Sequence, residues 1–207
     1  MRVRAVAVDG ENTSVQSRWI RLTFGGWCIG FVLAIVLILA AESIGVRETQ
    51  FPLALGMGAG VGFAQARLLL PYLWKRWPWV VATALGLAAP FVVADGARGI
   101  GNPLPYALPA YVALGGVSAG ILQWNLLRRV SEGAAWWLVA SPVAWMAAAT
   151  TVAVSDQVFQ VSRRVPLLNG LPGALLYLAV VLAGGVLLGG AGAPAVRRIM
   201  AGSRSGP

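Results

Sequence analysis

The sequence contains no histidine, one cysteine (Cys28) and one lysine (Lys75) among its 207 residues. Without histidine, the chain lacks the commonest protein ligand of haem, zinc and copper. One cysteine can form neither an intramolecular disulfide nor the thiolate set of a metal or iron–sulfur site. We therefore expect no metal centre, and the sequence leaves the identity of any other cofactor unknown.

The absence of histidine also bears on catalysis. The segment from Gly116 to Gly120 matches the G-x-S-x-G pattern of serine hydrolases around Ser118. That pattern supports catalysis only on a strand-to-helix turn and beside a general base. Here the segment lies inside an apolar run, and the one lysine lies in a distant turn. We expect Ser118 to be a packing residue and the protein not to be an enzyme.

Charged residues are scarce, at 11% of the chain against 58% hydrophobic residues, and the mean hydropathy is +0.74. Soluble domains carry about a quarter of charged residues, so this composition predicts a membrane protein surrounded by lipids. The net charge of +9 does not indicate a nucleic-acid partner, because the basic residues lie at the ends of apolar runs and not along one polar face.

Six apolar runs each approach or exceed the roughly 20 residues that span the hydrocarbon layer. They cover residues 23–41, 52–72, 77–94, 106–127, 136–154 and 171–196. We expect an all-α polytopic membrane protein with one six-helix transmembrane domain over residues 23–198. A polar cytoplasmic segment, residues 1–22, precedes this domain, and a flexible cytoplasmic tail, residues 199–207, follows it.

The distribution of lysine and arginine predicts the orientation. A cytoplasmic N-terminus puts 12 of the 16 basic residues on the cytoplasmic side and leaves Arg47, Arg98, Arg163 and Arg164 outside. This asymmetry satisfies the positive-inside rule. We expect both termini to be cytoplasmic and the protein to lie in a bacterial cytoplasmic (inner) membrane.

Several tryptophans flank the basic turns on the cytoplasmic side. Tryptophan is enriched at the headgroup level of membranes, where its amphipathic ring meets both solvents. We expect an interfacial anchoring role for Trp74, Trp77, Trp79, Trp136 and Trp137.

An internal repeat links two of the apolar runs through the pattern G-x-x-x-G-x-x-Q. A constant offset of 58 residues aligns Gly58, Gly62, Gln65, Trp79 and Thr83 with Gly116, Gly120, Gln123, Trp137 and Ser141. A third, weaker copy places Gly185 and Gly189 at the glycine positions and Gly192 at the glutamine position. We expect three pseudo-repeated helical hairpins around a common centre.

Glycines and glutamine spaced i, i+4 and i+7 lie on one side of a helix. Glycines allow close approach of helices, so we expect Gly58, Gly62, Gly116, Gly120, Gly185 and Gly189 to be helix-packing residues. Two interpretations of Gln65 and Gln123 remain open. The amides either bond neighbouring helices, or line an intramembrane polar site together with Arg67 and Asn125, which occupy matching positions.

Over Gly116 to Arg129, which reads G-x-x-x-G-x-x-Q-W-x-x-L-R-R, the chain resembles a diffuse group of uncharacterised bacterial multi-span membrane proteins built from such hairpins. The resemblance implies a helical membrane fold and brings no activity. Three two-helix repeats are also similar to the mitochondrial carrier architecture, but the carrier motif P-x-[DE]-x-x-[KR] is absent.

Two functional hypotheses follow. In the first, the protein is a non-catalytic accessory subunit that packs through its glycine faces against other membrane subunits or cofactors of a larger complex. In the second, it is a small-solute or lipid transporter or channel with a polar site lined by the repeat glutamines. Coupling to protons or sodium normally needs a carboxylate near the midplane, and we place none of the seven acidic residues there.

Overall fold

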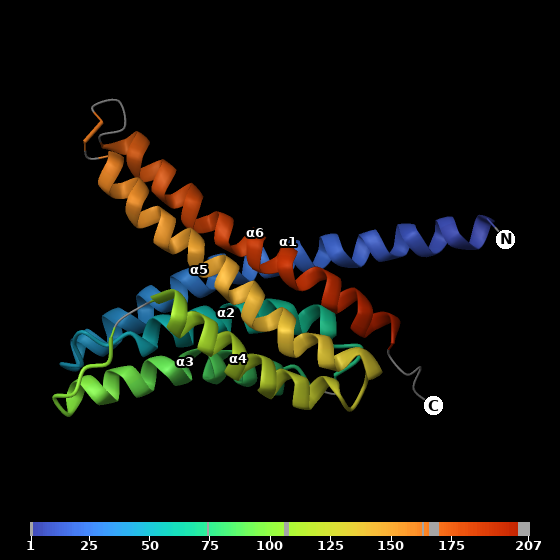
Figure 1. Ribbon diagram of the computed structural model, residues 1–207, viewed down its shortest axis with the longest axis horizontal. Helices are drawn as coiled ribbons and strands as arrows, with labels where there is room; N and C mark the ends of the chain where they lie inside the picture. Colours follow the sequence, from blue (N-terminus) through green and yellow to red (C-terminus); the bar gives the residue numbers. More distant parts are fainter. Residues whose placement is uncertain (1, 74, 106–107, 163, 166–169, 203–207) are drawn as a thin grey trace.

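The computed structural model describes residues 2–73, 75–105, 108–162, 164–165 and 170–202, with side chains from Ser14 onward. Within these ranges every regular element is helical, which confirms the all-α prediction (Figure 1). The elements are α1 (Arg2–Ser43), α2 (Phe51–Leu69), α3 (Trp77–Gly99), α4 (Leu108–Leu127), η1 (Glu132–Trp136), α5 (Trp137–Ser162) and α6 (Leu171–Ala201).

Five of these helices are long and apolar enough to cross a membrane, so the chain is a multi-pass membrane protein. They are α1 (from Ser14), α3, α4, α5 (with η1) and α6. Helix α2 is not among them, because its 19 residues include four glycines as well as Gln65 and Arg67. These residues lower its mean hydropathy, although 19 residues are close to the roughly 20 that span the hydrocarbon layer.

Helices α1 and α5 extend beyond their predicted runs, whereas α2 ends at Leu69 and not at the predicted residue 72. Helix α1 begins at Arg2, within the expected polar segment, and α5 continues to Ser162. Prolines occupy the first turns of α2, α3 and α6, where a missing backbone N–H costs nothing. The last residues of the expected tail, 203–207, lie outside the described residues.

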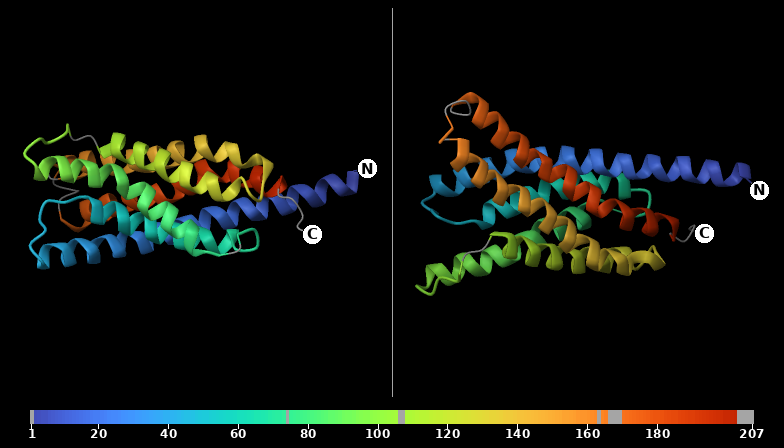
Figure 2. Two further views of the ribbon diagram at one scale, coloured as in Figure 1. Left: turned by 90° about the horizontal axis from the view of Figure 1, so that it is seen from below. Right: turned by 45° about the horizontal axis from the view of Figure 1, so that its top comes forward.

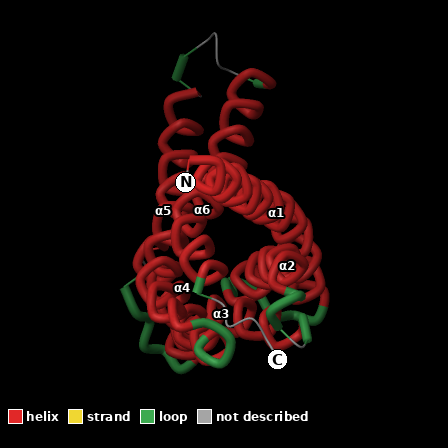
Figure 3. Tube along the Cα trace, turned by 90° about the vertical axis from the view of Figure 1, so that its right-hand side faces the viewer, coloured by secondary structure: helices red, strands yellow, loops and turns green. Residues whose placement is uncertain are grey.

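The six helices form a closed ring. Each one packs against its neighbours in the chain, and α6 packs against α1. Figure 3, along the long axis, shows α1 to α6 around a common centre. Figures 1 and 2 show α5 and α6 diverging from the other helices towards the turn that joins them, while the start of α1 projects beyond the bundle.

The two ends of the ring differ in charge. We call the end that holds residues 70–73, 75–76 and 128–131 the basic end, and the opposite one the distal end. At the basic end, the guanidinium groups of Arg67, Arg128 and Arg198 lie 4.9, 5.0 and 4.1 Å from the ring centroids of Phe63, Trp124 and Trp136. Such contacts hold an exposed cation over the face of an aromatic ring.

All six glycines of the repeat face a neighbouring helix at close range. A Cβ atom added to any of them would lie 3.0 Å or less from an atom of that helix. Added to Gly58 it would be 2.7 Å from Ala84 Cα, and added to Gly116 it would be 2.8 Å from Pro142 Cα. Gly185 meets Trp27 and Gly189 meets Ile20 in the same way, both on α1. The glycines therefore bring together helices of this same chain.

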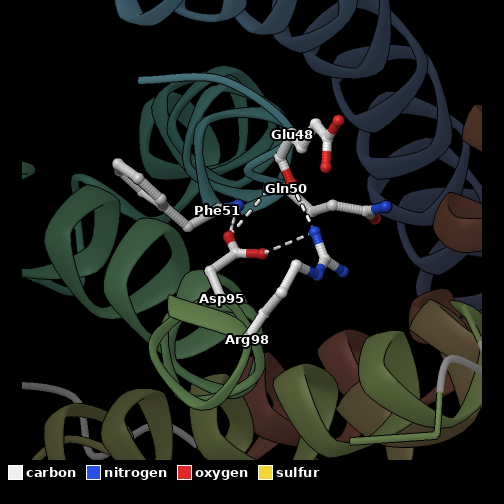
Figure 4. Close-up of polar contacts among 5 residues, drawn as sticks. All are labelled: Glu48, Gln50, Phe51, Asp95 and Arg98. Carbon is white, nitrogen blue, oxygen red and sulfur yellow. Dashed lines mark hydrogen bonds and ion pairs between the residues drawn. The ribbon is translucent and has the colours of Figure 1, made fainter. Parts of the chain in front are cut away.

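A polar contact ties α3 to the start of α2 at the distal end (Figure 4). One carboxylate oxygen of Asp95 accepts hydrogen bonds from the backbone N–H groups of Gln50 (2.7 Å) and Phe51 (2.9 Å). The other lies 3.8 Å from the guanidinium of Arg98, which also donates to the backbone oxygen of Glu48. Asp95 therefore pairs with Arg98 on its own helix and also caps the start of α2.

Candidate functional site

An apolar cavity of about 180 Å³ lies inside the distal half of the ring. All six helices contribute to its wall, among others through Phe31, Met57, Phe91, Val112, Trp145 and Val181. No Asp, Glu, Lys or Arg belongs to the wall, and its exposed surface is almost entirely carbon. The diverging ends of α5 and α6 contribute Val152 and Tyr177 on one side.

Two tryptophans form the floor of this apolar cavity. The rings of Trp27 and Trp145 lie 6.3 Å apart at an angle of 38°, and both side chains are buried. The indole N–H of Trp27 donates to the backbone oxygen of Val181 at 3.0 Å, which holds that ring against α6. Because its N–H is bonded to the backbone, Trp27 adds no unpaired donor to the wall of the cavity.

Beneath the floor, two buried glutamines connect successive helices. The Nε2 of Gln123 donates to Thr83 Oγ1 on α3 at 2.7 Å, and its Oε1 accepts from Trp137 Nε1 on α5 at 2.7 Å. We call these residues and their counterparts around Gln65 the amide–indole belt. A fully buried amide needs such partners, because an unpaired one costs several kcal/mol (about 2–7).

The contacts of Gln65 repeat those of Gln123. Its Nε2 donates to Thr23 Oγ1 on α1 at 3.3 Å, and its Oε1 accepts from Trp79 Nε1 on α3 at 3.4 Å. Both amides therefore bond a hydroxyl on the preceding helix and an indole on the following one. These contacts are hydrogen bonds between helices, as in the first of the two interpretations made from sequence.

The three indoles of the belt region meet near the axis. Trp137 lies 5.7 Å from Trp19 and 5.6 Å from Trp79, measured between ring centroids. Beside them is a second cavity, the belt cavity, of about 10 Å³, with Gln65 and Gln123 in its wall. Apolar side chains fill the space from here to the basic end, among them Ala66, Leu73, Leu127 and Ile199.

Of the four residues proposed for a polar site, the structure brings Gln65 and Gln123 together at the belt cavity. Arg67 is exposed and lies over Phe63 at the edge of the bundle. The Nδ2 of Asn125 donates to the backbone oxygen of Ile121 on its own helix at 3.2 Å. Neither Arg67 nor Asn125 belongs to the wall of the belt cavity.

The expected interfacial role of the tryptophans holds for only some of them. Trp77 and Trp136 are 62% and 53% exposed, as interfacial anchors should be. Trp79 and Trp137 are 0% and 4% exposed, so the prediction for these two is wrong. Trp137 directly follows Trp136, and Trp79 lies two residues after Trp77. Each residue of a helix turns the side-chain direction by about 100°, so both buried rings point to a different side from the exposed pair, towards the axis. Trp74 lies outside the described residues.

Sequence reasoning missed the partners of the amides, although the signal was present. Thr83 aligns with Ser141 and Trp79 with Trp137 at the same offset that aligns the glutamines. Aligned polar side chains inside apolar runs are candidates for mutual hydrogen bonds. Thr23 and Trp19 follow the same Trp-x-x-x-Thr/Ser spacing in the first helix.

No family model matches this chain, and neither a curated protein nor a solved structure is similar to it at a significant level.

Proposed function

We propose that the protein is a non-catalytic membrane protein that holds the apolar chain of a membrane lipid inside its helix ring. The observation that carries the proposal is the apolar cavity with walls from all six helices. Apolar cavities of about 150 Å³ stay dry and take up hydrophobic molecules of the size of benzene. A cavity of about 180 Å³ accommodates part of an acyl or prenyl chain.

The surroundings favour a lipid chain over a water-soluble ligand. A multi-pass chain is embedded in acyl chains, so these are the apolar molecules present at high concentration beside the diverging α5 and α6. The wall offers no charge to attract an ionic solute. Towards the basic end the axis is filled by Trp79, Leu127 and Val196, so a continuous path for solutes is not favoured in this conformation.

The accessory-subunit hypothesis depends on glycine faces that are free to pack against other proteins. Their contacts are with helices of the same chain, such as Gly58 with Ala84 and Gly185 with Trp27. The glycines therefore no longer argue for an external protein partner. The apolar cavity instead favours a role in binding lipids, which belongs to the transporter hypothesis. Association with other membrane subunits is a separate proposal.

We further propose the arrangement in the membrane. Six helices cross the inner membrane, including α2, which completes the ring between α1 and α3. The basic end and both termini face the cytoplasm, as the arginine distribution favours. The three pseudo-repeated units are α2–α3, α4–α5 and α6–α1, so the third unit joins the two ends of the chain.

The contacts across the proposed units are equivalent. Gly62 meets Thr83, and Gly120 meets Ser141, 58 residues later. In the third unit Gly189 of α6 meets Thr23 of α1, and Thr23 precedes Thr83 by 60 residues. The third unit therefore pairs the last helix, α6, with the first, α1. Three hairpins that follow one another in the sequence would instead pair α1 with α2, α3 with α4 and α5 with α6.

Quenching by brominated lipids tests the lipid proposal. Bromine on an acyl chain quenches a tryptophan only on contact, and Trp145 is 5% exposed. The fluorescence of Trp145 is the difference in emission between the wild type and Trp145→Phe. In nanodiscs of brominated phosphatidylcholine, we expect this fluorescence to be quenched. Ala149→Phe places a larger side chain in the apolar cavity and should protect Trp145 from quenching. Val186→Phe, on the exposed face of α6, should leave the quenching unchanged. An unquenched Trp145 in the wild type would overturn the proposal.

A further inference from the structure

The hydrogen bonds of the amide–indole belt run around the ring and stop at one place. They lead from Thr23 through Gln65 to Trp79, and from Thr83 through Gln123 to Trp137. A third link would lead from a hydroxyl on α5 through α6 to an indole on α1. The corresponding residues are Ser141 and Trp19, with Gly192 between them in place of a glutamine.

The indole of Trp19 is a buried donor without a partner. Its side chain is 1% exposed, and its Nε1 has no hydrogen-bond acceptor among the described residues. An ideal Cβ on Gly192 would lie 3.2 Å from this nitrogen, so the N–H group is next to the position that a third glutamine would use. An indole nitrogen only donates, so it requires an acceptor there.

Ser141 stands on the other side as an acceptor. Its hydroxyl donates to the backbone oxygen of Gly116 at 2.8 Å, which leaves its oxygen free to accept. Thr83 has the same double role in the complete link: its hydroxyl donates to the backbone oxygen of Trp79, on its own helix, at 2.8 Å and accepts from Gln123. The missing member of the third link must therefore accept from Trp19 and donate to Ser141.

We propose that the belt cavity is a binding site for one neutral hydroxyl group, which accepts from Trp19 Nε1 and donates to Ser141 Oγ in place of the third glutamine. Trp19, Ser141 and Gly192 all belong to the wall of this cavity. Its volume, about 10 Å³, corresponds to a single oxygen atom with its hydrogens. No charged side chain belongs to the wall, which favours a neutral group over an anion.

Two sources supply this chemistry, namely water and the terminal hydroxyl of an apolar alcohol. Trp145 borders both the belt cavity and the apolar cavity, so an alcohol could place its chain in the larger one. The site itself does not depend on the lipid proposal, because water alone satisfies both partners. Failure of one proposal therefore leaves the other intact.

Nuclear magnetic resonance of the full chain labelled with [¹⁵N-indole]tryptophan tests the site. Trp19→Phe identifies the resonance among those of the nine tryptophans. We expect the Trp19 indole proton at a downfield, hydrogen-bonded position, with a cross-peak to water. Loss of this cross-peak on addition of dodecan-1-ol, but not of dodecane, would assign the hydroxyl to an alcohol, whereas its persistence would assign it to water.

A matched pair of variants provides the second test. Gly192→Gln and Gly192→Ala add the same Cβ, which Trp19 must accommodate by a few tenths of an ångström, but only glutamine supplies the amide. We expect the glutamine variant to keep the indole proton downfield, to lose the water cross-peak and to melt at a higher temperature than the alanine variant. An indole proton at a free position in the wild type, or identical behaviour of the two variants, would overturn the proposal.

Discussion

The indole Nε1–H of Trp137 donates to the amide Oε1 of Gln123 at 2.7 Å, inside the bundle and beside a cavity whose wall holds no charged side chain. The same relationship joins Trp79 to Gln65 at 3.4 Å. Each glutamine is thereby fixed between two neighbouring helices. In a membrane, where water does not compete for such groups, this fixes the rotation of the helices about their axes.

Replacing Gln123 by leucine should destabilise the fold by about 1–3 kcal/mol, because it leaves the buried Trp137 N–H without its acceptor. Gln65→Leu should cost less, since its two hydrogen bonds are 3.3 and 3.4 Å long against 2.7 Å for both bonds of Gln123. Reversible unfolding in mixed micelles measures both. Asn125→Leu, on the same helix but bonded only locally, is the control and should leave the free energy of unfolding nearly unchanged.

Gly58→Ala should destabilise the contact between α2 and α3 by about 1–3 kcal/mol, because overpacking forces the backbones apart. The added Cβ would be 2.7 Å from Ala84 Cα, which is backbone and cannot rotate away. Gly96→Ala provides the contrast, since nothing lies within 4 Å of its added Cβ. There the better helix propensity of alanine should be neutral or stabilising. Equal melting temperatures for the two variants would contradict the close-packing account.

Asp95→Ala should loosen the start of α2 and cost about 0.5–2 kcal/mol, the range measured for loss of a helix cap. The carboxylate accepts two backbone N–H groups of residues 50 and 51 while its side chain is only 8% exposed. Faster hydrogen exchange at Phe51 would report the loss. Asp156→Ala, at an exposed position of α5, should leave this exchange rate unchanged. If both variants exchange alike, the cap contributes nothing.

Cysteine labelling tests the orientation that the arginines favour. In a Cys28→Ser background, an impermeant maleimide added to intact cells should label Arg47→Cys and fail to label Lys75→Cys and Arg129→Cys. All three positions are exposed, so access depends only on the side of the membrane. The pattern should invert in inside-out vesicles. Labelling of Lys75→Cys and Arg129→Cys from opposite sides would refute the arrangement.

The helical class and most of the spans could be predicted from sequence because the bilayer demands long apolar runs whose backbone groups bond within one segment. The helix over residues 171–201 follows from its apolar run, and the repeat predicted that Gly58 and Gly116 contact another helix. The orientation of Trp79 and Trp137 could not be predicted in the same way. A tryptophan next to a basic turn suits both the headgroup region and the core, and only the packing of α3 and α5 decides between them.

The sequence alone determined the solvent of this protein, the positions of its apolar helices and the residue types able to meet inside it, since these depend on composition and on spacing along one chain. Only the tertiary structure decided that α6 closes on α1, that Trp19 faces Gly192 without an acceptor, and that Arg67 points away from the belt. These features arise from contacts between segments far apart in the chain. The spacing of residues within a helix sets which side chains share a face, but not which helix that face meets.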